Sequence, residues 1–207
     1  MTTEQKYNIL NEICQARKST RDFLDRPVPP ELVEKISEIA LTSPYASNKK
    51  NWEITKVDDR AVIAAIAGTV EAHVLVLLEQ IRADLKNDFM AYAAHFSAFK
   101  SAPLLLILTF RSAPSLSLML SDPNDKILYW EQETYAKSIA CVAMLVLLAA
   151  ESLGLGSCFM TGPLLAEEEI GKIIKMKPGR SLGAVIPVGY KQEDDSRKGA
   201  KAQREDF

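Results

Sequence analysis

The segment from Arg17 to Arg21 gathers three cations and two hydroxyls within five consecutive residues. Arginine side chains form bidentate hydrogen bonds with phosphate, and the hydroxyl of Ser19 adds a neutral donor beside Arg17 and Lys18. The same segment follows a predicted helix, so its cations can instead complement the negative end of the helix dipole. Taken alone, the pattern leaves both a phosphate site and an ordinary charged helix end open.

Two further segments carry groups that suit a bound heterocycle. The first runs from Ser43 to Trp52 and includes Ser47, Asn48 and Lys50, which can hydrogen-bond a flat ring at its edge. An ordinary connecting loop before a buried tryptophan gives the same pattern. The second runs from Leu153 to Pro163, where three glycines let the backbone approach a ligand closely.

The glycine segment is not a dinucleotide fingerprint, because no strand precedes it and its third glycine has the wrong spacing. Cys158 within it has no neighbouring histidine in the sequence, so we do not expect a nucleophilic cysteine. The tail from 191 to 207 is highly charged. Lys201 and Arg204 in this tail could contact a phosphate or simply be solvated.

Composition limits the classes of protein that fit. The chain has 207 residues, 47% of them hydrophobic, and a formal net charge of −2. The apolar share excludes a disordered chain, and the charge does not favour a nucleic-acid binder that neutralises phosphates. The length suits a single domain over 1–207 and leaves no room for separate nucleotide and substrate domains. A cofactor and a substrate must therefore share one small fold or a subunit interface.

We expect a cytoplasmic protein without a metal site. Three cysteines without a paired motif do not indicate a disulfide framework, and two distant histidines do not indicate metal ligands. The N-terminus has no apolar signal core, and the longest apolar run, from Ile139 to Ala150, is well short of the about 20 residues of a membrane span.

Hydrophobic periodicity predicts the elements that must position these segments, with helix outweighing strand. The unbroken apolar run from Leu104 to Phe110 predicts a strand buried on both faces, and Asp122 and Pro123 predict the start of a long helix that stops at Gly154. We expect an α+β sandwich with four or five strands. The predicted helices cover 4–16, 31–40, 59–67, 71–86, 88–100, 124–153 and 167–176, and the predicted strands cover 52–57, 104–110 and 182–190.

In this order, the segments resemble the FMN-dependent nitroreductase family over nearly the whole chain. The matching stretches are Arg17 to Arg21 with Phe23, Pro27 and Val28; Ser43 and Pro44 through Asn48 to Trp52; Ala102 and Pro103 before the buried strand; Leu148 to Ser157 at the end of the long helix; and Val185 to Tyr190.

The resemblance implies a central, mostly antiparallel sheet surrounded by helices, in an intertwined homodimer with FMN at the subunit interface. It implies that Arg17 and Ser19 hold the FMN phosphate with Lys18 adjacent. Arg21 would lie near flavin N1 and the C2 carbonyl, where a fixed cation stabilises the reduced ring. Asn48 would bond the pyrimidine edge.

The remaining cofactor residues implied by the resemblance are Ser47 and Lys50 in the loop, Met160, Thr161 and Gly162 beside N5 and O4, and Lys201 and Arg204 as further phosphate contacts. Two of these depart from the family pattern. Lys50 replaces a frequent glutamine, which would add positive charge near the pyrimidine and raise the reduction potential. Thr161 replaces a frequent acidic residue, which is harmless if only the backbone contacts N5.

The implied activity is hydride transfer from NADH or NADPH through flavin N5 to a small acceptor, such as a nitroaromatic or a quinone, by a ping-pong mechanism. The flavin carries the chemistry, so no catalytic side chain is expected. Between Ser112 and Trp130, side chains such as Met119 and Tyr129 would line the acceptor pocket or pack at the interface. Two alternatives remain open: a specialised relative that destroys flavin, dehalogenates or oxidises azolines, and a non-catalytic flavin-binding sensor or scaffold.

Overall fold

The computed structural model of the chain describes residues 1–44, 50–111 and 116–192. Four strands form one sheet in the order β1-β2-β4-β3, and each neighbouring pair is antiparallel. Their bounds are β1 (Trp52–Val57), β2 (Leu104–Arg111), β3 (Gly156–Ser157) and β4 (Arg180–Gly189).

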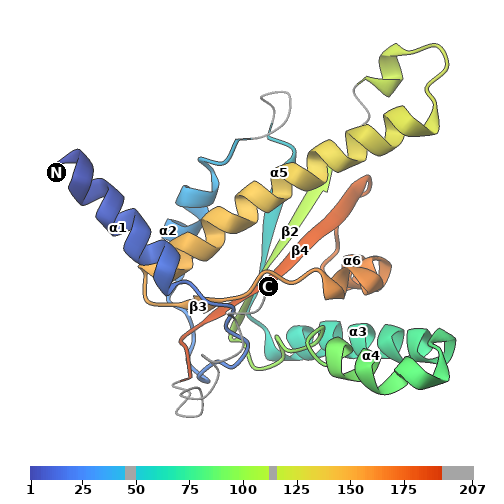
Figure 1. The fold of residues 1–207 in the computed structure, drawn as a ribbon, viewed down its shortest axis with the longest axis horizontal. Helices are drawn as coiled ribbons and strands as arrows, with labels where there is room; N and C mark the ends of the chain where they lie inside the picture. Colours follow the sequence, from blue (N-terminus) through green and yellow to red (C-terminus); the bar gives the residue numbers. More distant parts are fainter. Residues whose placement is uncertain (45–49, 112–115, 193–207) are drawn as a thin grey trace.

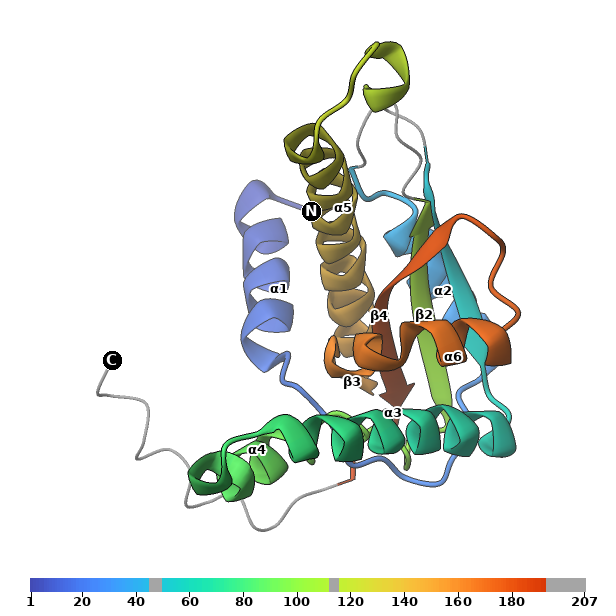
Figure 2. The same ribbon diagram turned by 90° about the vertical axis from the view of Figure 1, so that its right-hand side faces the viewer.

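Helices cover both faces of this sheet (Figures 1 and 2). The helices α2 and α5 pack on one face, and α3 and α6 pack on the other. This arrangement confirms the predicted α+β sandwich. The helices are α1 (Thr3–Ala16), α2 (Pro30–Ala40), α3 (Arg60–Gln80), α4 (Lys86–Ala93), α5 (Asp125–Ser152) and α6 (Glu167–Ile173), and the 3-10 turns are η2 (Ala83–Leu85), η3 (Ser117–Met119) and η4 (Gly162–Ala166).

The central strand β2 joins the two layers of the core. Leu104, Leu106 and Leu108 pack with α2 and α5, whereas Leu105 and Ile107 pack with α3 on the other face. Successive side chains of a strand point to opposite faces, so an unbroken apolar run is what a strand covered on both sides requires. The expectation of burial on both faces is confirmed.

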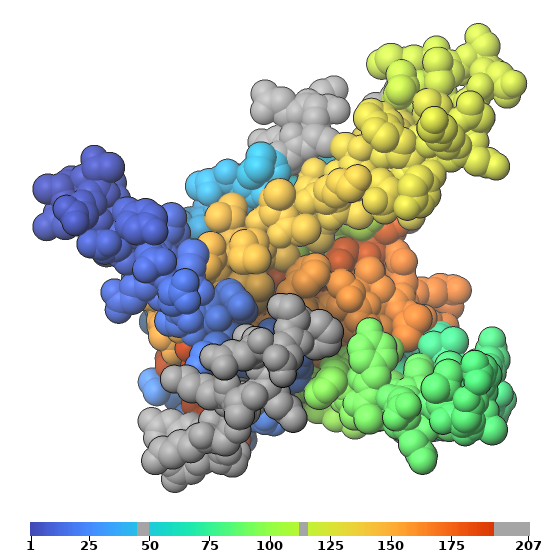
Figure 3. Space-filling model, viewed as in Figure 1, coloured from blue at the N-terminus to red at the C-terminus, as the bar shows by residue number. Residues whose placement is uncertain are grey.

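Two helices project from this body (Figures 1 and 3). The N-terminal part of α5 extends past the end of the sheet, and α1 has no buried residue at all. Tyr7 and Leu10 of α1 are 66% and 55% exposed. The helix α5 is capped by Asn124, whose side chain accepts a hydrogen bond from the amide of Ile127 at 3.1 Å. The predicted cap at Asp122 is therefore wrong by two residues.

The structure also corrects the predicted helix boundaries between β1 and β2. One continuous helix, α3, replaces the two predicted over 59–67 and 71–86. Gly68 does not break it, because a buried stripe that includes Ile63, Ile66 and Val70 continues through this position. The apolar burial outweighs the roughly 1 kcal/mol helix penalty of one glycine. The helix α4 is shorter than the predicted 88–100 and gives way to turns after Ala93.

Both α3 and α5 are long and apolar enough to cross a membrane by length and composition alone. In α5, half of the apolar window is buried against the sheet, which accounts for its composition. In α3, 28% of the window is buried. Core helices pass this test too, so it is weak evidence for a span.

Glu71 links α3 to the segment before β2, and this contact predicts how the stability of the fold depends on pH. Glu71 forms an ion pair with Lys100 and accepts a hydrogen bond from Ser97 Oγ at 2.9 Å. The hydrogen bond from Lys100 lowers the pKa of Glu71 below its ordinary value of 4.5. A carboxyl with a lowered folded-state pKa stabilises the fold above its unfolded pKa, and this contribution is lost as pH falls through the folded pKa.

We therefore expect Glu71→Gln to lower the free energy of unfolding at pH 7 by less than about 1 kcal/mol, since the pair is partly exposed. The difference from the parent chain should shrink below pH 4.5, as measured by urea unfolding across pH. A difference that grew on acidification would contradict this assignment. Glu34→Gln on α2 is the matched control at an exposed glutamate.

Candidate functional site

Residues 17–21, here called the cationic segment, lie along the edge of the sheet beside β3. Ser19 forms a parallel bridge with Ser157, and the amide of Thr20 donates to the Ser157 carbonyl at 2.9 Å. This places residues 17–21 next to the start of the glycine segment, as an extra partner for the short edge strand. The absence of a side chain at Gly156 permits the approach, because a Cβ there would lie 2.7 Å from the side chain of Thr20.

Within the cationic segment, Arg17 and Arg21 are half-buried, whereas Lys18 and Ser19 are exposed. Arg17 is the C-cap of α1, and its amide donates to the Ile13 carbonyl at 3.0 Å. The Nε atom of Arg21 is buried and has no hydrogen-bond partner within the described residues. An unsatisfied buried donor on a cation is costly, so an anionic or carbonyl acceptor placed here would be favoured.

Residues 153–163, here called the glycine segment, run through β3 into the start of η4. Met160 is 5% exposed, and its amide and carbonyl pair with those of Val185 at 3.1 Å in each direction. Thr161 is exposed, and Gly162 packs so closely on Phe96 that a Cβ would lie 2.5 Å from its ring. Tyr92 meets the Phe96 ring edge-on, with 4.9 Å between centroids. Each of these two glycines thus permits a close packing contact, Gly156 with Thr20 and Gly162 with Phe96.

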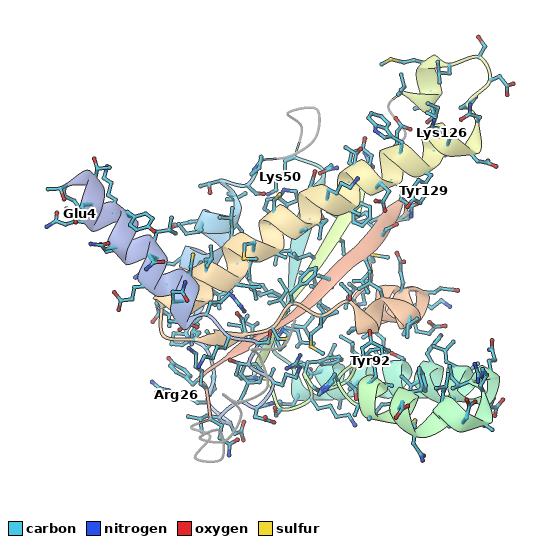
Figure 4. The ribbon with its side chains drawn as sticks, in the orientation of Figure 1. Glu4, Arg26, Lys50, Tyr92, Lys126 and Tyr129 are labelled. Atoms are coloured by element: carbon cyan, nitrogen blue, oxygen red, sulfur yellow. The ribbon has the colours of Figure 1, made fainter. Side chains whose placement is uncertain are left out.

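Lys50 lies away from the place where the cationic segment meets β3 (Figure 4). It precedes β1, which forms the opposite edge of the sheet from β3. Trp52 pairs with Phe110 at one end of β2, whereas Ser157 is aligned through β4 with Leu104 at the other end. The ammonium of Lys50 lies 4.5 Å from the ring centroid of Trp52. Within one chain, Lys50 therefore does not join Arg17, Ser19 and Gly162.

Four predicted cofactor residues lie outside the described part of the chain. They are Ser47, Asn48, Lys201 and Arg204.

Arg180, Thr109, Glu53 and Lys177 form a polar cluster at the end of the sheet near Lys50. Arg180 donates through Nε to Thr109 Oγ1 at 3.1 Å and lies 3.5 Å from Glu53 Oε1, with only 9% of its side chain exposed. Burial lowers the pKa of Arg180, and Glu53 opposes that effect. The hydrogen bond from Lys177 lowers the pKa of Glu53 below its ordinary value. The cluster ties the loop before β4 to β1 and β2.

The described residues supply binding groups at the edge of the sheet and no arrangement for acid–base catalysis there. Cys158 is 2% exposed, and His73 bonds the Thr69 carbonyl at 2.9 Å and approaches Glu169 at 3.5 Å, which joins α3 to α6. Across 1–44, 50–111 and 116–192, no group of three or more His, Cys, Asp or Glu is placed to hold a metal. A redox chemistry at this site would have to come from a bound group.

Three residues of the convergence were not singled out as contacts from the sequence. Thr20 faces Gly156, Ser101 Oγ donates to the Arg21 carbonyl at 3.3 Å, and Phe96 covers Gly162. Ser101 directly precedes Ala102 and Pro103, which carry part of the family resemblance, and this position was the one indication in the sequence of its contact. Phe96 belongs to a helical stripe that sequence alone assigns to packing.

The fold and this edge site define a class, an α+β sandwich with a cationic segment beside a glycine-rich strand. A model of the nitroreductase family matches residues 14–190. The chain belongs to the nitroreductase family, which confirms the resemblance.

Similar proteins carry two kinds of description. A Methanothermobacter thermautotrophicus protein, a putative NADH dehydrogenase/NAD(P)H nitroreductase, is 29% identical over 88% of this chain and 78% of its own length. The iodotyrosine deiodinase of Haliscomenobacter hydrossis is 26% identical over 86% of this chain and 77% of its own length. A Caenorhabditis elegans iodotyrosine dehalogenase 1 homolog is 24% identical over 93% of this chain, which spans only 58% of that relative.

Solved structures share the fold. A BluB-like flavoprotein from Clostridium difficile superposes with a TM-score of 0.79 at 21% identity, covering 89% of this chain and 91% of the other. A Desulfitobacterium hafniense nitroreductase with bound FMN gives a TM-score of 0.69 at 17% identity, covering 94% and 92%. At these identities the likeness supports the fold.

The close contact at Gly156 gives a test of the edge arrangement. We expect Gly156→Ala to lower the free energy of unfolding by about 1–3 kcal/mol, because the new methyl must displace Thr20. Removing the Thr20 side chain in the double variant Thr20→Ala with Gly156→Ala should recover part of this loss. Urea unfolding of both single variants and the double variant measures the coupling.

The control is Gly68→Ala, at an exposed helical glycine with no atom within 4 Å of a new Cβ. That change should stabilise the chain by about 0.5–1 kcal/mol. Additive losses in the double variant would show that Gly156 and Thr20 do not constrain each other.

Proposed function

We propose that the chain is an FMN-dependent oxidoreductase that passes hydride from NADH or NADPH to a small acceptor such as a nitroaromatic or a quinone. The observation that carries this proposal is the convergence of the cationic segment, with its unsatisfied Arg21 Nε, and the glycine segment at one sheet edge. Family membership and relatives described as NAD(P)H nitroreductases support it.

The residues present suit the parts of FMN. Arg17 and Ser19, with Lys18 adjacent, supply cationic and hydroxyl donors for the phosphate. The half-buried guanidinium of Arg21, whose Nε has no acceptor within the described residues, would stabilise negative charge at N1 and the C2 carbonyl. FMN, when bound, supplies a ring that accepts and returns a hydride at N5. The backbone at Thr161 and Gly162, on which Phe96 packs, would lie beside that atom, and the pairing of buried Met160 with Val185 holds this backbone in register with β4.

The site is completed by a second copy of the chain. Lys50 precedes β1 at the edge of the sheet opposite Ser19 and Ser157, and Ser47 and Asn48 come shortly before Lys50 in the sequence. A loop at the opposite edge reaches the flavin only if it comes from a partner. An isologous pair of copies forms two such sites at once. We assign Lys201 and Arg204 as further phosphate contacts on the resemblance alone, and a cytoplasmic location on the sequence.

Exposed apolar surface supports the homodimer. The helix α1 buries none of its residues, and Tyr129 and Trp130 on the projecting end of α5 are 66% and 54% exposed. These are large side chains of the kind that interfaces bury, and they lie on the two elements that project from the body in Figure 3.

A dehalogenating enzyme is the second candidate. Two observations favour it: relatives described as iodotyrosine deiodinase or dehalogenase match most of this chain, and a deiodinase structure with FMN and 3-iodo-L-tyrosine has a TM-score of 0.68. Turnover of 3-iodotyrosine against turnover of a quinone by the same reduced protein separates the two candidates.

Flavin loading and anaerobic bleaching test the proposal. Purified protein incubated with FMN should become yellow after desalting, and NADH or NADPH should bleach it without oxygen. Arg17→Ala should weaken FMN binding about ten- to hundredfold, since a charge-assisted bond to phosphate is lost. Arg82→Ala, at an exposed arginine bound to Asp84, is the control. Protein that takes up no FMN refutes the cofactor, and yellow protein that neither nucleotide bleaches favours a sensor or scaffold.

Lys50 gives a separate prediction. A lysine at the pyrimidine edge stabilises the negative charge of the reduced ring, so Lys50→Gln should lower the midpoint potential of bound FMN. The potential is measured by anaerobic titration with a reference dye. Lys56→Gln, at an exposed lysine within β1, is the control. An unchanged potential in Lys50→Gln would remove the electrostatic role.

A further inference from the structure

Arg60, the first residue of α3, joins three segments of the chain near the cationic segment. Its Nη1 atom donates to the carbonyls of Ser101 and Ala102, at 3.0 Å each, in the turn before β2. Its Nη2 atom donates to Asp25, in the stretch that follows the cationic segment. One planar guanidinium group thus holds the turn before β2 and the residues after Arg21 in a fixed relation.

The place of Arg60 in its helix is by itself unfavourable for a cation. The N-terminus of a helix carries a partial positive charge, so the helix dipole repels an arginine there. The ion pair with Asp25 offsets little of this cost, because 93% of the Asp25 side chain is exposed. The bonds to the carbonyls of Ser101 and Ala102 are therefore the contacts that hold the Arg60 side chain in place.

The turn before β2 in its own right contacts the cationic segment at Arg21. Ser101 Oγ donates to the Arg21 carbonyl at 3.3 Å. Two residues further, Phe23 is 4% exposed and lies with Pro103 against Gly189: a Cβ on that glycine would be 2.9 Å from Phe23 and 2.6 Å from Pro103. The backbone that carries the Arg21 side chain therefore rests on this turn.

The position of the Arg21 backbone determines where its guanidinium can bind a ligand. The side chain is half-buried, and its Nε atom has no hydrogen-bond partner within the described residues. A hydrogen bond to a ligand forms only at about 2.7–3.2 Å and weakens steeply when the donor is misaligned. A small displacement of the backbone at Arg21 would therefore weaken its contact with a bound flavin.

We infer that Arg60 is a positioning residue for Arg21: through the turn before β2, it holds the Arg21 guanidinium where negative charge develops on reduced FMN. This inference rests on the proposed function. Loss of the positioning weakens the binding of reduced FMN more than that of oxidised FMN, because only the reduced ring carries the charge that Arg21 stabilises. The phosphate contacts proposed for Arg17 and Ser19 serve both states alike.

The midpoint potential of bound FMN in Arg60→Lys tests the inference. Lysine keeps the charge but lacks the rigid planar group that bonds two segments at once. We expect the variant to bind reduced FMN about tenfold more weakly relative to oxidised FMN, which for a two-electron couple lowers the potential by about 30 mV. The Kd for oxidised FMN should stay close to that of the parent. Arg82→Lys is the matched control, because Arg82 also pairs with an exposed aspartate, Asp84, at 2.6 Å, beyond the other end of α3.

A double-mutant cycle shows whether Arg60 acts through Arg21. In the Arg21→Ala background, Arg60→Lys should leave the potential unchanged, because the cation that it positions is already gone. An equal drop in both backgrounds would overturn the positioning role. A parent-like potential in Arg60→Lys with Arg21 intact would overturn it too, since the charge alone would then suffice.

Ser101→Ala keeps the inference falsifiable if Arg60→Lys folds poorly, because it removes only the 3.3 Å bond to the Arg21 carbonyl. This variant should lower the potential in the same direction. A lower melting temperature with an unchanged potential would show that the turn before β2 has a structural role alone. Failure of the parent protein to bind FMN would instead refute the proposed function.

Discussion

The pairing of Thr20 with the Ser157 carbonyl determines the arrangement of the site. Without it, Arg17 to Arg21 would be a charged helix end with no fixed relation to the glycine segment. The bond can form because Gly156 has no side chain to hold Thr20 away. One backbone contact between residues far apart in the chain thus converts two weak sequence patterns into one site. Arg21 Nε, which has no hydrogen-bond partner among residues 1–44, 50–111 and 116–192, would favour a negatively charged or carbonyl-bearing ligand at the proposed site.

The sheet separates the two halves of the proposed cofactor site. The strand β2 places β1 and β4 on its two sides, so Lys50, just before β1, and the segment beside β3 are held at opposite edges. The buried layers on both faces make this separation rigid. The proposed homodimer would bring these two edges together from different copies, and it would cover the exposed side chains of α1 and α5.

Local patterns predicted the elements well where a single signal dominated. The run from Leu104 to Phe110 could only be a doubly covered strand, and Gly154, with a φ of +74°, ends α5 as expected. Patterns failed where tertiary packing decided, as at Gly68 inside α3. The contacts of Ser101 and Phe96 with the site could not be predicted, because they depend on how α4 and its following turns cross the sheet edge. The resemblance predicted cofactor residues from separate parts of the chain, but only the fold shows that Lys50 and Ser19 lie at opposite edges of the sheet.

The short strand β3 has a further consequence for the sheet. It covers only two residues of β4, so most of that strand would present an open edge. Met160 pairs with Val185 further along β4, and the N-terminal segment covers the outer side of β3 and the residues after β4: Ser19 pairs with Ser157, Phe23 with Lys191, and the Leu24 amide donates to the Tyr190 carbonyl at 3.0 Å. A charged segment along an edge discourages pairing with the strand of another molecule. The same few residues that favour a phosphate therefore also protect the chain from edge-to-edge aggregation.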